Sequence, residues 1–198
     1  MTSWVLLRHG ESVGNRERWL AGSTDTPLTD RGREQAREAG EALASTPLVR
    51  ALSSTLVRAR DTAELALEGR RVPLSCHAEL CERELGAWAT RKIEDVRAEV
   101  GDQIWSWTEA APEGESGGDV AARALAFLRT VPRVEGTTLV VCHGGVIRSL
   151  LGLVEDTPYG LIGKRKIPNA VPIPVDLGAG GWEAVWDRHV QELERFRR

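Results

Sequence analysis

Short apolar segments alternate with helical patterns along this chain, and this alternation limits its fold more than any other feature. The candidate strands are residues 4–7, 49–53, 72–76, 137–142, 171–177 and 182–186. The candidate helices are residues 31–44, 56–67, 94–100, 102–110, 116–131 and 146–153, with a charged helix after residue 186. Because strands joined through helices run parallel, the pattern predicts an α/β protein. We expect a three-layer α/β/α sandwich around a mostly parallel central sheet.

Polar residues mark the expected starts of three helices. Thr29 is placed to cap the helix at 31–44, and Ser116 has the capping-box spacing to Asp119. Ser54 or Thr55 is the candidate cap of the helix at 56–67. Side chains of this kind accept hydrogen bonds from the free amides of a first helical turn, so these helices should begin directly after them.

Composition limits the class of protein and its partners. A chain of 198 residues, 41% hydrophobic, is expected to form one domain over 1–198. A net charge of -3 argues against a dedicated nucleic-acid partner. No apolar run approaches the roughly 20 residues that span a bilayer, and the apolar N-terminal stretch is too short for a signal peptide. Three cysteines cannot all pair, which favours a reducing cytoplasm. The sequence leaves a homodimer open.

Two histidines follow predicted strands directly. His9 lies between Arg8 and Gly10 after the first strand, and His143 precedes Gly144 after the strand at 137–142. Ligands of α/β sheets bind at the carboxyl ends of the strands, so both histidines are expected to face one pocket. An adjacent arginine disfavours imidazolium and keeps a nucleophilic lone pair on His9. The helix that follows His143 offers free amides, including that of Gly144, to an anion.

A third basic group follows the second strand. Arg58 lies in the expected first turn of the helix at 56–67. A guanidinium is permanently charged and forked, which suits the oxygens of a phosphate. Arg50 and Arg60 lie close by, and the local pattern alone does not select among them.

Several motifs, taken in order, resemble one known family. They are Arg8-His9-Gly10-Glu11, residues 22–29, residues 53–63, residues 80–88, residues 112–116 and His143-Gly144-Gly145. Together they are similar to the histidine phosphatase superfamily, which contains the cofactor-dependent phosphoglycerate mutases. The resemblance covers about three quarters of the chain and implies a phosphoglycerate mutase-like fold.

The resemblance also implies a role for each matching residue. His9 matches the histidine that accepts the phosphoryl group, and Arg8, Arg58 and His143 match the groups that hold its oxygens. Asn15 matches a further phosphate-binding residue, and Gly22 a position beside the substrate. Glu82 matches the proton donor to the leaving oxygen, although spacing alone leaves Glu79 and Glu84 open. Two arginines and a histidine supply the charge that a metal often supplies in phosphoryl transfer, so neither a metal nor another cofactor is expected.

Three departures from the mutases favour a phosphatase acting on a small phosphorylated metabolite. Leu85 stands where mutases carry a tyrosine, and Trp105 and Trp107 stand where they carry an arginine pair. Ala89 replaces the glycine that usually follows Trp88. A mutase must grip a substrate carboxylate and exclude water, and these residues are poorly suited to either task. Phosphoglycerate mutase is the alternative activity.

Other readings of the sequence are weaker. Gly114-Glu115-Ser116-Gly117-Gly118 fits the pattern of a serine esterase, but no strand precedes the serine as such an elbow requires. Cys76, His77 and Cys81 lack the second pair that a zinc site needs. The segment 164–166 is basic and is more typical of a solvated loop than of a binding site. A non-catalytic regulatory domain should have lost part of the motif set, which is complete here.

Overall fold

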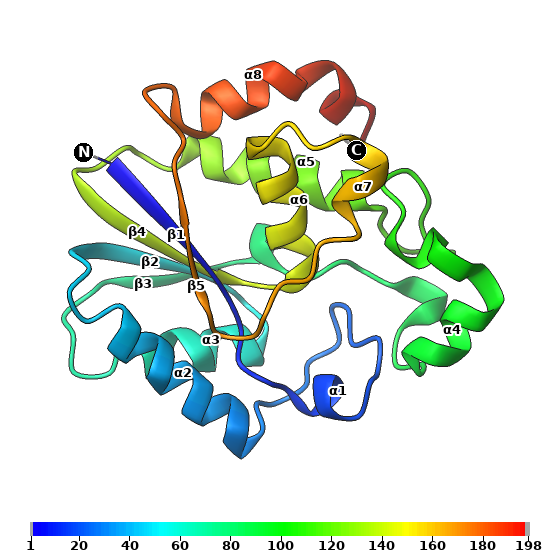
Figure 1. Ribbon diagram of the computed structural model, residues 1–198, viewed down its shortest axis with the longest axis horizontal. Helices are drawn as coiled ribbons and strands as arrows, with labels where there is room; N and C mark the ends of the chain where they lie inside the picture. Colours follow the sequence, from blue (N-terminus) through cyan, green and yellow to red (C-terminus); the bar gives the residue numbers. More distant parts are fainter. Residues whose placement is uncertain (1, 197–198) are drawn as a thin grey trace.

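A five-stranded sheet forms the centre of the computed structural model, which describes residues 2–196 (Figure 1). The strands are β1 (Thr2–Arg8), β2 (Leu48–Ser54), β3 (Leu74–His77), β4 (Gly136–Cys142) and β5 (Pro172–Val175). Their order is β3-β2-β4-β1-β5, and only β5 runs antiparallel to its neighbour. The register of β1 and β4 pairs Arg8 with Cys142, so the two strands end side by side. The mostly parallel sheet is confirmed.

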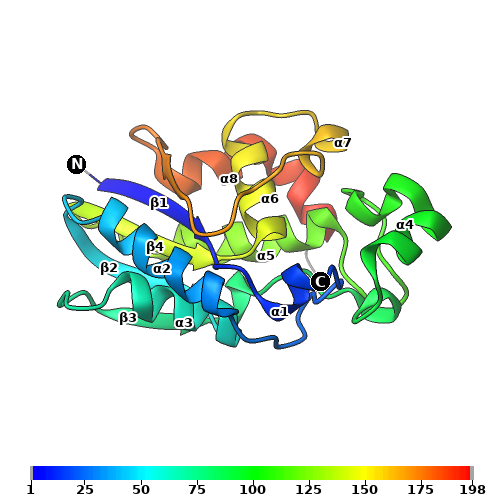
Figure 2. The ribbon, with the colours of Figure 1, turned by 60° about the horizontal axis from the view of Figure 1, so that its bottom comes forward.

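Helices cover both faces of the sheet (Figure 2). On one side lie α2 (Asp30–Ala42) and α3 (Val57–Ala66), and on the other α5 (Gly117–Thr130), α6 (Gly144–Val154) and α8 (Gly181–Leu193). Side chains of β1 alternate between the two cores: Trp4 and Leu6 pack toward α5, α6 and α8, whereas Val5 and Leu7 pack toward α2 and α3. This double burial explains the continuous apolar run and confirms the three-layer sandwich.

A separate group of short elements projects beyond the carboxyl ends of the strands. It includes α1 (Val13–Arg16), α4 (Ile93–Val100), α7 (Tyr159–Ile162) and three 3-10 turns at Ala78–Leu80, Gly86–Trp88 and Gly101–Trp105; a fourth turn, Glu194–Phe196, follows α8. A third apolar cluster holds part of this group together, and its buried members are Leu20, Leu85, Trp88, Val96, Ile104 and Ala111. Within residues 2–196 no helix is long and apolar enough to span a membrane.

Two predicted elements were wrong. The helix expected at 102–110 ends as a 3-10 turn at Trp105, because the Ser106 hydroxyl accepts hydrogen bonds from the amides of Thr108 and Glu109. The strand expected at 182–186 is the start of α8. Its buried residues Trp182, Val185 and Trp186 are spaced by three and four, which is the helical period.

Of the three helix caps expected from the sequence, two are present in the structure. The Thr29 side chain accepts a hydrogen bond from the amide of Gly32, and Ser116 forms its capping box with Asp119. The cap of α3 was placed wrongly, because α3 begins at Val57. Its first amide donates to Asp25 Oδ1 at 2.7 Å, so a residue distant in sequence replaces the local cap.

Candidate active site

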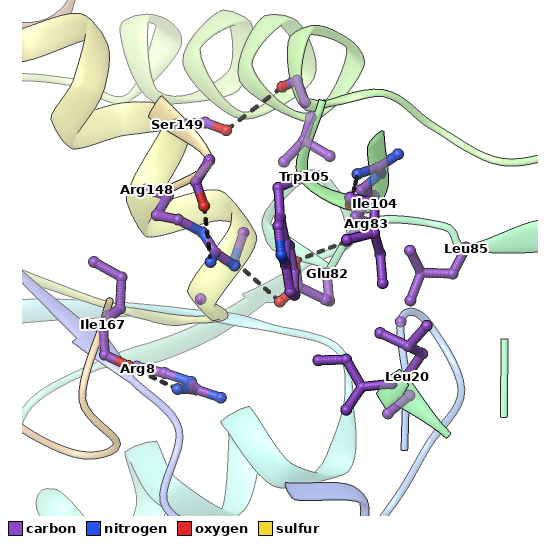
Figure 3. Close-up of a pocket in the computed structure, with 18 of the residues that line it drawn as sticks. Arg8, Leu20, Glu82, Arg83, Leu85, Ile104, Trp105, Arg148, Ser149 and Ile167 are labelled. Atoms are coloured by element: carbon purple, nitrogen blue, oxygen red, sulfur yellow. Dashed lines mark hydrogen bonds between the residues drawn. The ribbon is translucent and has the colours of Figure 1, made fainter. Parts of the chain in front are cut away.

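A cavity of about 590 Å³ opens where β1 and β4 end (Figure 3). Seven of the residues singled out from the sequence line it: Arg8, His9, Asn15, Gly22, Arg58, Glu82 and Gly144. His143 lies behind this wall, fully buried, with its ring centroid 5.1 Å from that of His9. The structure therefore brings together residues that are up to 136 positions apart in the chain.

The backbone holds the His9 ring in one tautomer. The His9 amide donates to the carbonyl of Cys142 at 3.0 Å, which fixes the end of β1 on β4. Nδ1 lies 2.7 Å from the Gly10 carbonyl oxygen. Because a carbonyl can only accept, Nδ1 carries the hydrogen and Nε2 keeps its lone pair. Gly10 cannot be replaced without movement, since a Cβ there would lie 2.2 Å from the carbonyl oxygen of Gly32.

Both histidines are held neutral by their surroundings. Burial, and then the charges of Arg58 and Arg8, lower the pKa of His9 well below its ordinary value. Burial lowers the pKa of His143 in the same way, with Arg58, His9 and Arg8 acting in the same direction. Neither ring nitrogen of His143 has a hydrogen-bond partner among residues 2–196. The two histidines thus place an uncharged imidazole with a free Nε2 lone pair and a second uncharged ring in one positive field.

Two arginines create that field. Arg8 donates from Nη1 to the carbonyl of Ile167 at 2.7 Å. Arg58, which is 2% exposed, donates to the carbonyls of Thr24 and Gly22 at 2.9 and 2.6 Å. Neither guanidinium forms an ion pair within residues 2–196, and burial lowers the pKa of each. Carbonyl dipoles orient these cations without neutralising them, which leaves their charge for an anion.

Glu82 reaches the cavity from the loop after the first 3-10 turn. Its Oε2 accepts from the amide of Gly145 at 3.1 Å and its Oε1 from the amide of Arg83 at 2.9 Å. The two other glutamates considered from the sequence lie elsewhere. Glu79 is exposed, and Glu84 accepts hydrogen bonds from Ser23 and from the amides of Leu85 and Gly86. Of the three carboxylates, Glu82 alone lines this cavity.

The remaining predicted residues shape the wall. Asn15 accepts hydrogen bonds through Oδ1 from Asn169 and from the amide of Ser12, so its amide hydrogens stay free for a ligand. Gly22 adopts φ +52, a left-handed conformation that favours glycine. Gly144 lies beside Arg8, and a Cβ there would be 3.4 Å from Arg8 Nε.

Arg148 and Lys166 are lining residues that the sequence missed or left open. Arg148 lies four residues after Gly144 on α6, and this helical spacing places both on one face of the helix. Its guanidinium stacks on the Trp105 ring, 5.0 Å from the ring centroid. Lys166 also lines the cavity, whereas Lys164 and Arg165 do not. A single basic residue of that segment therefore reaches the site.

The weaker alternatives find no geometric support. Ser116 is buried as a helix cap and bonds to Asp119, and no strand precedes it. His189, the histidine downstream of Ser116 that such an esterase could use, bonds to Tyr159 and to the carbonyl of Leu153. Among the described residues no three His, Cys, Asp or Glu side chains are grouped as metal ligands would be.

The chain is similar to curated proteins of two activities. The chain is 33% identical to 2,3-bisphosphoglycerate-dependent phosphoglycerate mutase 2 of Gloeobacter violaceus, covering 91% of this chain and 88% of the relative. It is 31% identical to the adenosylcobalamin/alpha-ribazole phosphatase of Salmonella typhimurium, covering 91% and 92%.

Solved structures place the chain in the same group. Bacillus stearothermophilus YhfR superposes with a TM-score of 0.84 at 32% identity, covering 91% of this chain and 93% of that one. A mycobacterial glucosyl-3-phosphoglycerate phosphatase superposes at 0.78 and 29%, covering 88% and 92%. The profile of the histidine phosphatase superfamily (branch 1) matches residues 4–188. The chain therefore belongs to branch 1 of the histidine phosphatase superfamily.

Proposed function

We propose that this protein hydrolyses a phosphomonoester of a small metabolite through a phosphohistidine formed on His9. The observation that carries the proposal is the setting of His9. Its Nδ1 is engaged by Gly10, and its ring lies in the field of Arg8 and Arg58, which form no ion pair within residues 2–196. A neutral imidazole held beside two cations suits attack on a dianionic phosphate.

The first step transfers the phosphoryl group to the enzyme. His9 Nε2 attacks phosphorus and forms the N–P bond while the P–O bond to the leaving group breaks. Arg8, Arg58 and His143 hold the three equatorial oxygens, on which negative charge is concentrated in the transition state. Glu82, placed by the amide of Gly145, gives a proton to the leaving oxygen so that an alcohol departs.

The second step returns the enzyme to its starting state. Glu82, now a carboxylate, takes a proton from a water molecule as the oxygen of that water attacks phosphorus. The N–P bond breaks and its electron pair returns to His9 Nε2. Inorganic phosphate leaves, and Glu82 is again protonated for the next turnover.

Phosphoglycerate mutase is the second candidate, because several curated relatives with that activity are 33–37% identical to this chain. Two contacts favour hydrolysis. Leu85, which lines the cavity where the resemblance places a tyrosine, offers no hydrogen bond to a carboxylate. The guanidinium of Arg83, the residue after Glu82, already donates to the carbonyls of Ile104, Glu109 and Glu115. It is therefore poorly suited to bind the carboxylate of a phosphoglycerate.

The deciding experiment follows both products in one reaction. Purified protein is incubated with 3-phosphoglycerate, with and without 2,3-bisphosphoglycerate, and within a panel of other phosphomonoesters. A phosphatase releases inorganic phosphate from at least one ester faster than it forms 2-phosphoglycerate. Faster, bisphosphate-dependent formation of 2-phosphoglycerate would instead establish the mutase.

A further inference from the structure

The cavity has two chemically different halves. Arg8, His9 and Arg58 form the half at the strand ends. The other half is mainly apolar. Its apolar wall is formed by Leu20, Leu85, Ile104, Trp105, Ile162 and Ile167, and Arg83, Arg148 and Lys166 also line the cavity. Figure 3 shows Leu20 and Leu85 on one side of Glu82 and Ile167 on the other. A phosphate bound at the strand ends would thus direct its ester group into an apolar chamber.

The apolar wall is a packed structure of its own. Leu20, Leu85 and Ile104 are 6%, 7% and 1% exposed and belong to the third apolar cluster. Arg83 stabilises this cluster by donating hydrogen bonds to the carbonyls of Ile104, Glu109 and Glu115. A wall fixed in this way offers a preformed surface to a ligand, which lowers the entropic cost of binding.

Trp105 lines this cavity, as do Trp19 and Trp107. Its half-buried indole belongs to the same cavity lining as Glu82 (Figure 3). The Arg148 guanidinium stacks on the ring, and Gly163 packs on its backbone, where a Cβ would lie 2.2 Å from the Trp105 carbonyl oxygen. Trp107 is buried, stacks on Tyr159 and donates from Nε1 to Glu192.

We propose that this apolar half is a leaving-group pocket for a ring-bearing alcohol, and that Trp105 determines that specificity. The inference rests on the proposed function, since Glu82 must contact the leaving oxygen and Trp105 lines the same cavity as Glu82. A cavity of about 590 Å³ accommodates a ligand of drug-like size. Of the named wall residues, Trp105 is the one that is only half-buried, so a ring that packs against its indole removes more apolar surface from water than a three-carbon acid does.

The test uses phosphonates, in which carbon is bonded directly to phosphorus without the ester oxygen, so that binding is measured without turnover. Ethylphosphonate, benzylphosphonate and 1-naphthylmethylphosphonate are titrated calorimetrically into the unaltered protein and into Trp105→Ala and Trp105→Phe. Phe127→Ala is the matched control, because Phe127 is a half-buried aromatic residue of α5 that contacts His77 and does not line the cavity.

The proposal predicts that affinity rises about tenfold with each added ring in the unaltered protein and in Phe127→Ala. Trp105→Ala should lose most of the affinity that the rings add, and of the three ligands its affinity for ethylphosphonate should change least. Trp105→Phe should retain part of the affinity that the rings add. An affinity that does not rise with ring size, or a full gain in Trp105→Ala, would overturn the proposal.

A parallel assay with the matching phosphate esters separates this proposal from the proposed function. Release of inorganic phosphate from ethyl, benzyl and 1-naphthylmethyl phosphate is measured with the same four proteins. If no ester is cleaved while the phosphonates bind as predicted, the hydrolase assignment fails and the apolar pocket stands. If all are cleaved without preference for rings and the phosphonates bind alike, the pocket assignment fails and the hydrolase stands.

Discussion

The contact between Glu82 and Gly145 permits a sharp test of the proton donor. A Cβ added at Gly145 would lie 2.3 Å from Glu82 Oε1 and 3.2 Å from its carboxyl carbon. A Cβ atom normally lies at least about 3.4 Å from a neighbouring heavy atom. In Gly145→Ala the Glu82 carboxylate must therefore move by about 1 Å. The same displacement weakens the hydrogen bond from the Gly145 amide, which is 3.1 Å long.

The expected loss depends on how much the leaving group needs a proton. A misplacement of about 1 Å costs on the order of 10²-fold in rate, and we expect that loss for an alkyl phosphate. 4-Nitrophenolate leaves readily without a proton, so 4-nitrophenyl phosphate should lose distinctly less. The free energy of unfolding should increase while activity falls, because alanine in place of glycine in the first turn of α6 stabilises the helix by up to about 1 kcal/mol.

The assay compares kcat/KM for benzyl phosphate and for 4-nitrophenyl phosphate, together with urea unfolding. Gly160→Ala is the matched control, since a Cβ at that helical glycine meets nothing within 4 Å. The reasoning is refuted if Gly145→Ala keeps full activity on benzyl phosphate, or if both substrates lose activity equally in a protein that unfolds more easily.

Three further outcomes are expected. Because the pKa values of His9 and His143 are lowered on folding, the unfolded chain binds more protons than the folded chain below pH 6.5. The free energy of unfolding should therefore decrease as the pH is lowered through this range, by up to about 1.4 kcal/mol per pH unit per histidine. If urea titrations of His143→Asn show the same dependence on pH as the unaltered protein, this expectation is contradicted. Arg83→Met should lower the free energy of unfolding in urea by about 3 kcal/mol, because it leaves three carbonyls without a donor. The control Arg91→Met removes an exposed ion pair and should hardly change the urea midpoint of unfolding. Hydrolysis should survive EDTA and be inhibited by vanadate, which adopts five-coordinate geometry; activity lost to chelation and restored by zinc or magnesium contradicts the charge assignment.

The core of the cavity could be located from sequence because it depends on strand ends. His9 and His143 follow apolar runs directly, and parallel strands deliver such residues to one edge of a sheet. Arg58 needed the family resemblance, since Arg50 and Arg60 have the same local chemistry. In the structure Arg50 bonds to Thr138 and Pro132 and Arg60 is half exposed, away from the cavity lining.

Features that depend on long-range packing could not be predicted. The cap of α3 comes from Asp25, which is 32 residues away, and no local pattern announces it. The position of Trp105 depends on Arg148 and Gly163, which belong to a distant part of the chain. The segment at 182–186 was misassigned because a short run with two tryptophans suits a strand, and only its burial against α5 shows the helical period.

The most direct test of the account is the capture of the covalent intermediate. The protein is mixed with a ³²P-labelled substrate, quenched within milliseconds, and the label is followed on the protein through acid and base treatment. The account predicts a base-stable, acid-labile phosphoenzyme that maps to His9, is absent in His9→Ala and forms slowly in His143→Ala. Near-normal turnover by His9→Ala, or a label that maps to another residue, would contradict it.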